Sequence, residues 1–320
     1  MMKPLVVVAG PTAAGKSAAG VELALRLGGS VISADSMQVY RHMDIGTAKM
    51  TPEEMRGVPH ALIDIIDPEE EWNVVRFQQE AQRAVGEICA RGELPILVGG
   101  TGFYIQALLY DIDFTRTEED SAFRAEMAQV AAAEGSEALH ARLQVVDPKA
   151  AQAIHPNNVK RVIRALEYAR DTGRTISAHN AEQRERPPAY DAVFFCLTMD
   201  RQRLYERIDR RVDQMMEEGL VDEVRSLRDR GLSASDVSMQ GLGYRQILSY
   251  LDDDCSLKEA VTQIKTQTRH FAKRQLTWFR REKDVIWMQA DAYETPELLA
   301  DEMEARVRNH FKQADFAGRT

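Results

Sequence analysis

Five short apolar runs divide the chain and predict the strands of a sheet. Most are continuous rather than alternating and are rich in β-branched residues, which is typical of strands buried on both faces of a parallel sheet. The runs cover residues 5–9, 31–34, 61–66, 95–98 and 192–199. Because helical stretches separate them, we expect right-handed βαβ units and an α/β fold with a doubly wound parallel sheet.

Helical periodicity fills the segments between these runs. The clearest predicted helices cover residues 17–27, 74–91, 121–134, 136–146 and 158–172. Two of them are expected to begin on the serine caps Ser121 and Ser136. A third has Asn158 as its expected cap, and Gly173 lies just past its end.

The stretch between the fourth and fifth predicted strands is helical throughout. We therefore expect residues 113–186 to form an all-helical insertion in a core made of residues 1–112 and 187–320. After the run at 192–199, which is the last clear strand, the core is expected to be helical again. One apolar helix face there consists of Leu204, Ile208, Val212, Met215 and Met216.

Composition places the chain among globular proteins. It has 320 residues, of which 44% are hydrophobic and 28% charged, and a net charge of −9. Its three cysteines, Cys89, Cys196 and Cys255, form no CxxC pair, so they predict no zinc site and suit a reducing compartment. The apolar run 5–9 is too short for a signal-peptide core. We expect a cytoplasmic monomer with no membrane segment.

The first predicted strand runs directly into a phosphate-binding motif. The pattern GxxxxGK[ST] is matched by Gly10, Pro11, Thr12, Ala13, Ala14, Gly15, Lys16 and Ser17. Its glycines let backbone N–H groups surround an anion, and the following helix adds the positive end of its dipole. Lys16 is expected to reach the terminal phosphate, while the Ser17 hydroxyl is a ligand for Mg²⁺. The motif predicts a di- or triphosphate site without naming the reaction.

Two further strand ends are expected to lie beside this motif, because ligands bind at the carboxyl ends of parallel strands. Asp35 follows the second strand, where it either caps the next turn or faces the ligand, and position alone favours neither. Thr101, in the segment Gly99-Gly100-Thr101-Gly102, follows the fourth strand. The glycines there also suit a plain turn, but Thr101 would add a hydroxyl to the site.

Positive charge is concentrated locally although the whole chain is acidic. Lys160, Arg161 and Arg164 begin one predicted helix of the insertion. A second basic helix is expected at residues 269–283, where aromatic residues alternate with cations in a pattern that suits phosphate contacts and base stacking. The alternative is a solvated basic face with Phe271 and Trp278 in the core, and we favour that alternative for the two aromatics.

Several long motifs resemble the tRNA dimethylallyltransferase (tRNA isopentenyltransferase) family. They are GPTAAGKS, ISADSMQVYRHMDIGTAK, PILVGGTGFYIQAL, VKRVIRALE, QGLGYRQ and TRHFAKRQLTWFR, in order from Val7 to Arg281. The resemblance implies a P-loop-type core and Mg²⁺-assisted transfer of a dimethylallyl group from dimethylallyl diphosphate. The acceptor would be N6 of the adenosine on the 3′ side of the anticodon, in tRNAs that read codons starting with U.

The resemblance also implies residue roles. The P-loop would hold the diphosphate with no need for ATP, Asp35 would accept the proton from N6, and Thr101 would lie beside the base. Arg211 would bind the leaving diphosphate, although Arg207 and Arg210 fit the same motif. The residues implied in tRNA binding are Asp35, Ser36, Met37, Gln38, Thr101, Arg124, Val159, Lys160, Arg161, Val162, Ile163, Gly243, Arg245, Lys273 and Arg280.

The resemblance implies the bacterial form, because the cysteines supply none of the C-terminal zinc finger that eukaryotic members carry. The tail after about Gln313 is expected to be disordered. Two other enzymes share parts of the pattern: an adenylate prenyltransferase acting on free nucleotides, and a P-loop metabolite kinase. The helical insertion and the basic segment argue against the first, which needs no RNA clamp. A non-catalytic RNA-binding protein would leave the P-loop unexplained.

Overall fold

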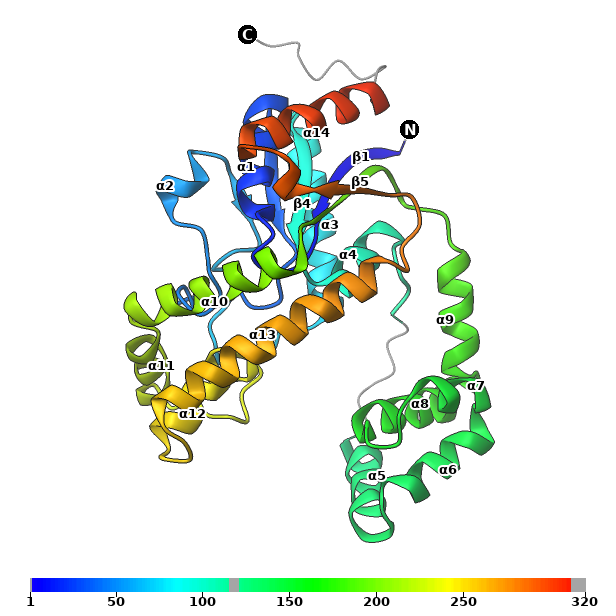
Figure 1. Ribbon diagram of the computed structural model, residues 1–320. Helices are drawn as coiled ribbons and strands as arrows, with labels where there is room; N and C mark the ends of the chain where they lie inside the picture. Colours follow the sequence, from blue (N-terminus) through cyan, green and yellow to red (C-terminus); the bar gives the residue numbers. More distant parts are fainter. Residues whose placement is uncertain (1, 115–120, 312–320) are drawn as a thin grey trace. The chain divides into compact units, whose positions relative to one another are not determined.

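The computed structural model describes residues 2–114 and 121–311, so the tail after Gln313 lies outside the described residues. The chain divides into two compact units, one made of residues 1–111 and 188–320 and the other of residues 112–187 (Figure 1). Each boundary lies one residue from the position expected from the sequence. Within the described ranges, no helix is both long and apolar enough to cross a membrane.

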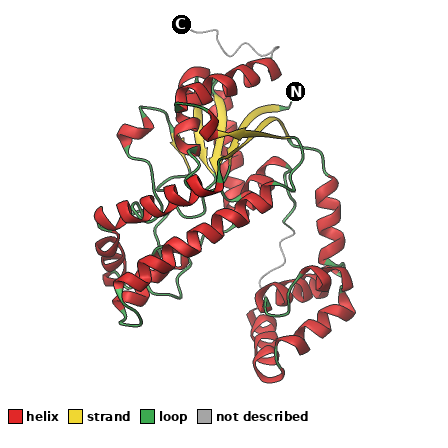
Figure 2. Cartoon of the chain, viewed as in Figure 1, coloured by secondary structure: helices red, strands yellow, loops and turns green. Residues whose placement is uncertain are grey.

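The larger unit is built on one six-stranded sheet in which every pair of neighbours is parallel (Figure 2). In spatial order the strands are β3 (His60–Ala61), β2 (Gly29–Ser33), β4 (Leu94–Gly99), β1 (Lys3–Ala9), β5 (Tyr190–Thr198) and β6 (Val285–Gln289). The expected doubly wound α/β fold is confirmed. Continuous apolar runs become the inner strands because helices cover both faces, and β1 is fully buried from Leu5 to Ala9.

One helix layer covers each face of the sheet. Helices α1 (Lys16–Leu27) and α14 (Pro296–His310) pack together over one face, where Leu23 and Met303 belong to one apolar cluster. Helices α3 (Val74–Ala90) and α4 (Gly102–Leu109) pack over the other, where the rings of Phe77 and Tyr104 stack.

Two strand predictions were wrong. Of residues 61–66 only Ala61 is in a strand, because Leu62 and Asp64 have positive φ angles of 65° and 55° and turn the chain out of the sheet. The following N–H groups of Ile65 and Ile66 bond instead to the carbonyl of Val39. The prediction also missed β6, an edge strand in which only Met288 is buried, although four apolar residues run from Val285 to Met288.

Helices complete the larger unit after β5. They are α10 (Arg201–Glu217), α11 (Leu220–Asp229), α12 (Tyr244–Leu251) and α13 (Leu257–Phe279), and a short α2 (Pro52–Met55) follows β2. The expected apolar face of α10 buries Leu204, Ile208 and Val212. Helix α13 ends at Phe279, so the prediction of one basic helix reaching Lys283 was wrong, and Arg280 lies just past the helix.

The smaller unit is helical throughout its described part. Its helices are α5 (Ser121–Glu134), α6 (Ser136–Val146), α7 (Pro148–Ala153), α8 (Val159–Thr172) and α9 (Ile176–Glu185). Asn158 caps α8 through its side chain, and Gly173 ends that helix with a left-handed backbone, as expected. Ser136 is not a cap, because Gly135 occupies that position. The cap of α5 lies outside the described residues.

A buried carboxylate joins two helices of this unit. Glu167 of α8 is fully buried and accepts hydrogen bonds from Arg124 of α5, with Nε to Oε1 at 2.8 Å and Nη2 to Oε2 at 3.0 Å. Arg164 adds a bond of 2.9 Å to Oε2. Burial opposes ionisation of Glu167, but the bonds from the two arginines outweigh it and lower its pKa.

This pairing predicts a local stability effect. In Glu167→Gln, amide hydrogens face two guanidinium groups, so the smaller unit should lose about 1–3 kcal/mol of unfolding free energy. Because Trp72, Trp278 and Trp287 all lie in the larger unit, helical circular dichroism should report early unfolding while tryptophan fluorescence keeps its midpoint. The exposed Glu126→Gln is the matched control and should change neither signal. A shift of the fluorescence midpoint alone would contradict the assignment.

Candidate active site

The P-loop, residues 10–17, connects β1 to α1 and is fixed by its contact with β5. Gly10 has a φ angle of 144°, and a Cβ atom there would lie 2.5 Å from the carbonyl oxygen of Leu197. Any side chain would therefore separate the loop from the sheet. Ala13 and Gly15 also have positive φ angles, of 63° and 90°, and they bend the loop into the first turn of α1.

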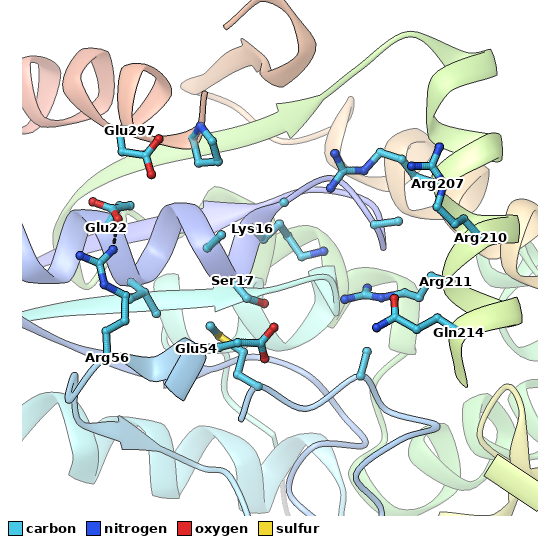
Figure 3. A pocket seen from close by; sticks show the side chains of 17 residues that line it. Lys16, Ser17, Glu22, Glu54, Arg56, Arg207, Arg210, Arg211, Gln214 and Glu297 are labelled. Atoms are coloured by element: carbon cyan, nitrogen blue, oxygen red, sulfur yellow. Dashed lines mark hydrogen bonds and ion pairs between the residues drawn. The ribbon is translucent and has the colours of Figure 1, made fainter. Parts of the chain in front are cut away.

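Lys16 and Ser17 begin α1 and line an open cavity of about 640 Å³, here called the outer cavity (Figure 3). The Lys16 Nζ atom donates a hydrogen bond of 2.7 Å to the carbonyl of Pro11. Burial lowers the pKa of Lys16 to about 8, with a smaller lowering by Arg211 and an opposing effect of Asp35. The ammonium group of Lys16 has therefore lost part of its hydration, and an anionic ligand would compensate for this loss.

Three arginines of α10, Arg207, Arg210 and Arg211, line the outer cavity opposite α1 (Figure 3). Only Arg211 of the three also lines a second, inner cavity of about 90 Å³. Arg211 is an exposed residue that faces the cavity, and the protein around it displaces part of its bulk water. This loss of bulk water, followed by the charge of Arg207, lowers the pKa of Arg211.

The inner cavity brings together residues from seven separate segments of the chain. Thr12, Lys16 and Ser17 come from the P-loop, and Asp35 and Gln38 follow β2. Its remaining lining residues are Val31, Ser33, Thr47, Ala48, Met50, His60, Ile63, Val98, Gly99, Gly100, Arg211, Phe271 and Gln275. A phosphate-binding loop and a carboxylate thus face one space, with apolar side chains between the strand ends.

Asp35 is both a turn cap and a wall of the inner cavity. Its Oδ1 atom accepts hydrogen bonds from the backbone N–H groups of Met37, at 2.9 Å, and Gln38, at 3.4 Å. Within the described chain, no hydrogen bond occupies its second carboxylate oxygen. The two roles left open by the sequence are therefore compatible, because each uses a different oxygen atom.

Gln38 is held by a loop that the site prediction did not include. Its Nε2 atom donates to the carbonyls of Thr47, at 3.3 Å, and Ala48, at 3.4 Å. The Ser33 hydroxyl donates to its Oε1 atom at 3.2 Å. These bonds fix the direction of the Gln38 amide beside Asp35.

Glu223 of α11 in turn holds this loop. Its carboxylate accepts three backbone N–H bonds, from Asp44 and Ile45 at 2.8 Å each and from Gly46 at 3.0 Å. The Tyr244 hydroxyl donates a fourth bond at 2.7 Å. The DIGTAK part of the resemblance already marked this loop, but nothing local in the sequence connects it to Glu223.

The remaining candidates of the larger unit lie around α12 and α13. Ser36 and Met37 are half-buried, and so is Thr101, at the N-cap of α4. Gly243 is the buried N-cap of α12, and the exposed Arg245 bonds to Gln267. Exposed Lys273 lines a surface hollow of about 480 Å³ together with His270, Arg274, Thr277, Trp278 and Arg281. Neither Phe271 nor Trp278 is fully buried, so the expected core role holds only partly.

The candidates of the smaller unit divide by exposure. Lys160 and Arg161 are exposed in the first turn of α8, and Val159 is half-buried. Val162 and Ile163 belong to the unit's apolar core together with Leu139 and Leu166. Their side chains therefore pack inward, and Arg124 is engaged with Glu167.

A metal ion at this site would be coordinated mainly by the bound phosphorylated ligand and water, rather than by protein side chains. Across residues 2–114 and 121–311, no group of three His, Cys, Asp or Glu side chains is placed to hold a metal ion. Ser17 stands at the start of α1 in both cavities. Mg²⁺ commonly keeps water ligands and takes phosphate oxygens, so one protein hydroxyl fits such a site.

The parallel sheet, the P-loop and the cation-lined cavities define a P-loop-type α/β enzyme that binds a phosphorylated ligand. A family model described as IPP transferase matches residues 38–282, and one described as isopentenyl transferase matches residues 3–70. The chain belongs to the IPP transferase family.

Individual relatives agree over nearly the whole chain. A tRNA dimethylallyltransferase of Lachnoclostridium phytofermentans is 55% identical over 94% of this chain and 96% of its own length. The structure of a tRNA isopentenylpyrophosphate transferase from Bacillus halodurans is 46% identical, with a TM-score of 0.73 over 97% of this chain and 98% of that one. A eukaryotic dimethylallyltransferase acting on tRNA is 30% identical, with a TM-score of 0.81 over 97% and 79%.

The lowered pKa of Lys16 predicts how anion binding depends on pH. An alkyl diphosphate, whose last ionisation lies near a pKa of about 6, should bind best while Lys16 is protonated. Its affinity should change little around pH 7 and fall up to about tenfold per unit above the Lys16 pKa of about 8. Titration calorimetry between pH 7 and 10 measures this.

Two variants test the assignment to Lys16. Lys16→Ala should bind weakly and lose the pH dependence, because no titrating ammonium remains in the loop. Lys258→Ala, which removes an exposed lysine at the start of α13, should retain both the affinity and the slope. An affinity of the unaltered chain that stays constant from pH 8 to 10 would exclude Lys16 as the titrating group.

Proposed function

We propose that the chain transfers a dimethylallyl group from dimethylallyl diphosphate to a tRNA adenosine. The acceptor atom is N6 of the adenosine on the 3′ side of the anticodon, in tRNAs that read codons starting with U. The products are N6-(dimethylallyl)adenosine and diphosphate. The observation that carries this proposal is the inner cavity, in which the P-loop and Asp35 face each other. The names of the relatives support the same reaction.

In this proposal the P-loop holds the leaving group. Backbone N–H groups, Lys16 and Arg211 surround the diphosphate while the bond between the prenyl carbon and its oxygen breaks. Their charge stabilises the developing diphosphate, and the prenyl carbon gains allyl-cation character. Arg211 is the best placed of the three arginines, because it alone borders both cavities. Mg²⁺ bound at Ser17 would neutralise part of the diphosphate charge.

Asp35 acts on the acceptor. An exocyclic amine conjugated with a purine is a poor nucleophile, so a carboxylate that takes its proton as the carbon–nitrogen bond forms helps the reaction. The bonds of Met37 and Gln38 to Oδ1 orient the carboxylate and leave its other oxygen toward the cavity. Thr101 follows β4 at the same edge of the sheet and is proposed to contact the base.

The exposed cations are proposed to hold the anticodon stem-loop. Lys160 and Arg161 combine with the positive N-terminal end of α8, and Lys273 and Arg280 lie on and beyond α13. An anticodon loop is single-stranded, so its target base can leave the stack at modest cost. We propose that the smaller unit clamps this stem-loop and that the enzyme acts as a cytoplasmic monomer.

Radiolabelled dimethylallyl diphosphate tests the reaction directly. With Mg²⁺ and without ATP, label should enter an unmodified transcript of a tRNA that reads codons starting with U. The matched control is the same transcript with guanosine in place of the target adenosine, which should stay unlabelled. Label that enters only AMP would instead support an adenylate prenyltransferase. Activity that requires ATP would support a kinase.

Asp35→Asn separates the chemical role of Asp35 from its role in the turn. An amide oxygen still accepts the two backbone bonds, but the amide cannot take the proton. Turnover should fall roughly 10²–10⁴-fold while the dissociation constant for tRNA stays within a few-fold. Rapid-quench kinetics and filter binding measure the two quantities. If tRNA binding collapses together with turnover, Asp35 serves the fold rather than the reaction.

A further inference from the structure

Gln275 is a buried polar side chain that the proposed mechanism does not use. It lies in α13 and is 6% exposed, although its neighbours Lys273 and Arg274 are exposed. Its Oε1 atom accepts a hydrogen bond of 2.9 Å from the backbone N–H of Thr12, in the P-loop. Its Nε2 atom donates one of 3.0 Å to the carbonyl of Gly100, just after β4. One amide therefore joins two loops that are far apart in the sequence.

The space around this amide is closely filled. A Cβ atom at Gly100 would lie 2.2 Å from Gln275 Nε2, so glycine leaves the room that the side chain occupies. Both bonded backbone groups border the inner cavity, as does Gln275 itself. The bridge requires an acceptor and a donor on one planar group. Glutamate in its charged form lacks the donor, and methionine has no donor and only a weakly accepting sulfur.

Helix α13 makes a second contact with the same loop. A Cβ atom at Gly102 would lie 2.2 Å from the indole of Trp278, so this ring packs directly on the backbone of Gly102. Gln275 and Trp278 thus contact the loop on either side of Thr101. Of these two contacts, only Gln275 also reaches the P-loop through a hydrogen bond.

We propose that Gln275 is a positioning residue that keeps the P-loop and the loop carrying Thr101 at a fixed separation. The first loop holds the prenyl diphosphate and the second lies beside the acceptor base, so this role rests on the proposed function. Without the bridge, the Thr12 N–H and the Gly100 carbonyl lose their buried partner and the two loops move independently. A displacement of about 1 Å between reacting groups is enough to slow a reaction about 10²-fold.

Gln275→Met tests the bridge, because methionine has a similar length and no hydrogen-bonding amide. Single-turnover rates at saturating donor and tRNA should fall about 10²-fold, while the dissociation constant for tRNA stays within a few-fold. Gln263→Met is the matched control in the same helix, where the glutamine is exposed, and should keep the normal rate. Unfolding measurements at the assay temperature establish that each variant is folded.

Gln275→Glu supplies a readout that a purely structural role would not give. The carboxyl group accepts from Thr12 in either form but donates to Gly100 only when it is protonated. The rate of the Gln275→Glu variant relative to the unaltered chain should therefore rise as the pH falls. The relative rate of Gln275→Met should stay constant. Measurements between pH 5.5 and 8.5 compare the two at saturating substrates.

The outcomes separate the two proposals. If the unaltered chain does not label tRNA, the proposed function fails. If it labels tRNA and Gln275→Met is as fast as the Gln263→Met control, only the positioning role fails. That role also fails if the relative rate of Gln275→Glu does not depend on pH. A slow Gln275→Met together with acid rescue of Gln275→Glu supports it.

Discussion

The contact between the P-loop and β5 is the constraint on which the active site depends. Gly10 lies so close to the Leu197 carbonyl that no side chain fits, and this contact fixes where the loop leaves the sheet. Because all strands are parallel, the segments after β1, β2 and β4 emerge at the same edge. An anion site, a carboxylate and a hydroxyl thereby meet without any long side chain reaching across the protein.

The positive charge of the active site is a local feature of a chain that is acidic as a whole. The chain carries a net charge of −9, yet Lys16 and three arginines of α10 line the outer cavity. Burial there works against the cations themselves, as the lowered pKa values of Lys16 and Arg211 show. A bound diphosphate would relieve this cost, so the free site is electrostatically prepared for an anion.

The sequence predicted the features that have a local physical cause. The buried run before the P-loop, the Asn158 cap and the Gly173 stop were all correct. The strand predicted at residues 61–66 was wrong because a mainly apolar run does not distinguish a strand from a turn, which here has positive φ angles at the buried Leu62 and the exposed Asp64. Glu223 and Gln275 were missed for another reason: their partners lie 179 and 263 residues away, and no periodicity or motif records such contacts.

The early end of β3 has a consequence for how this protein behaves at high concentration. The strand contains only His60 and Ala61 before Leu62 turns the chain away. An exposed sheet edge can template the addition of strands from other molecules, and very short edge strands are one way in which proteins prevent it. The turn at Leu62, where the strand prediction was wrong, therefore keeps the β3 edge too short to template the addition of strands from other molecules.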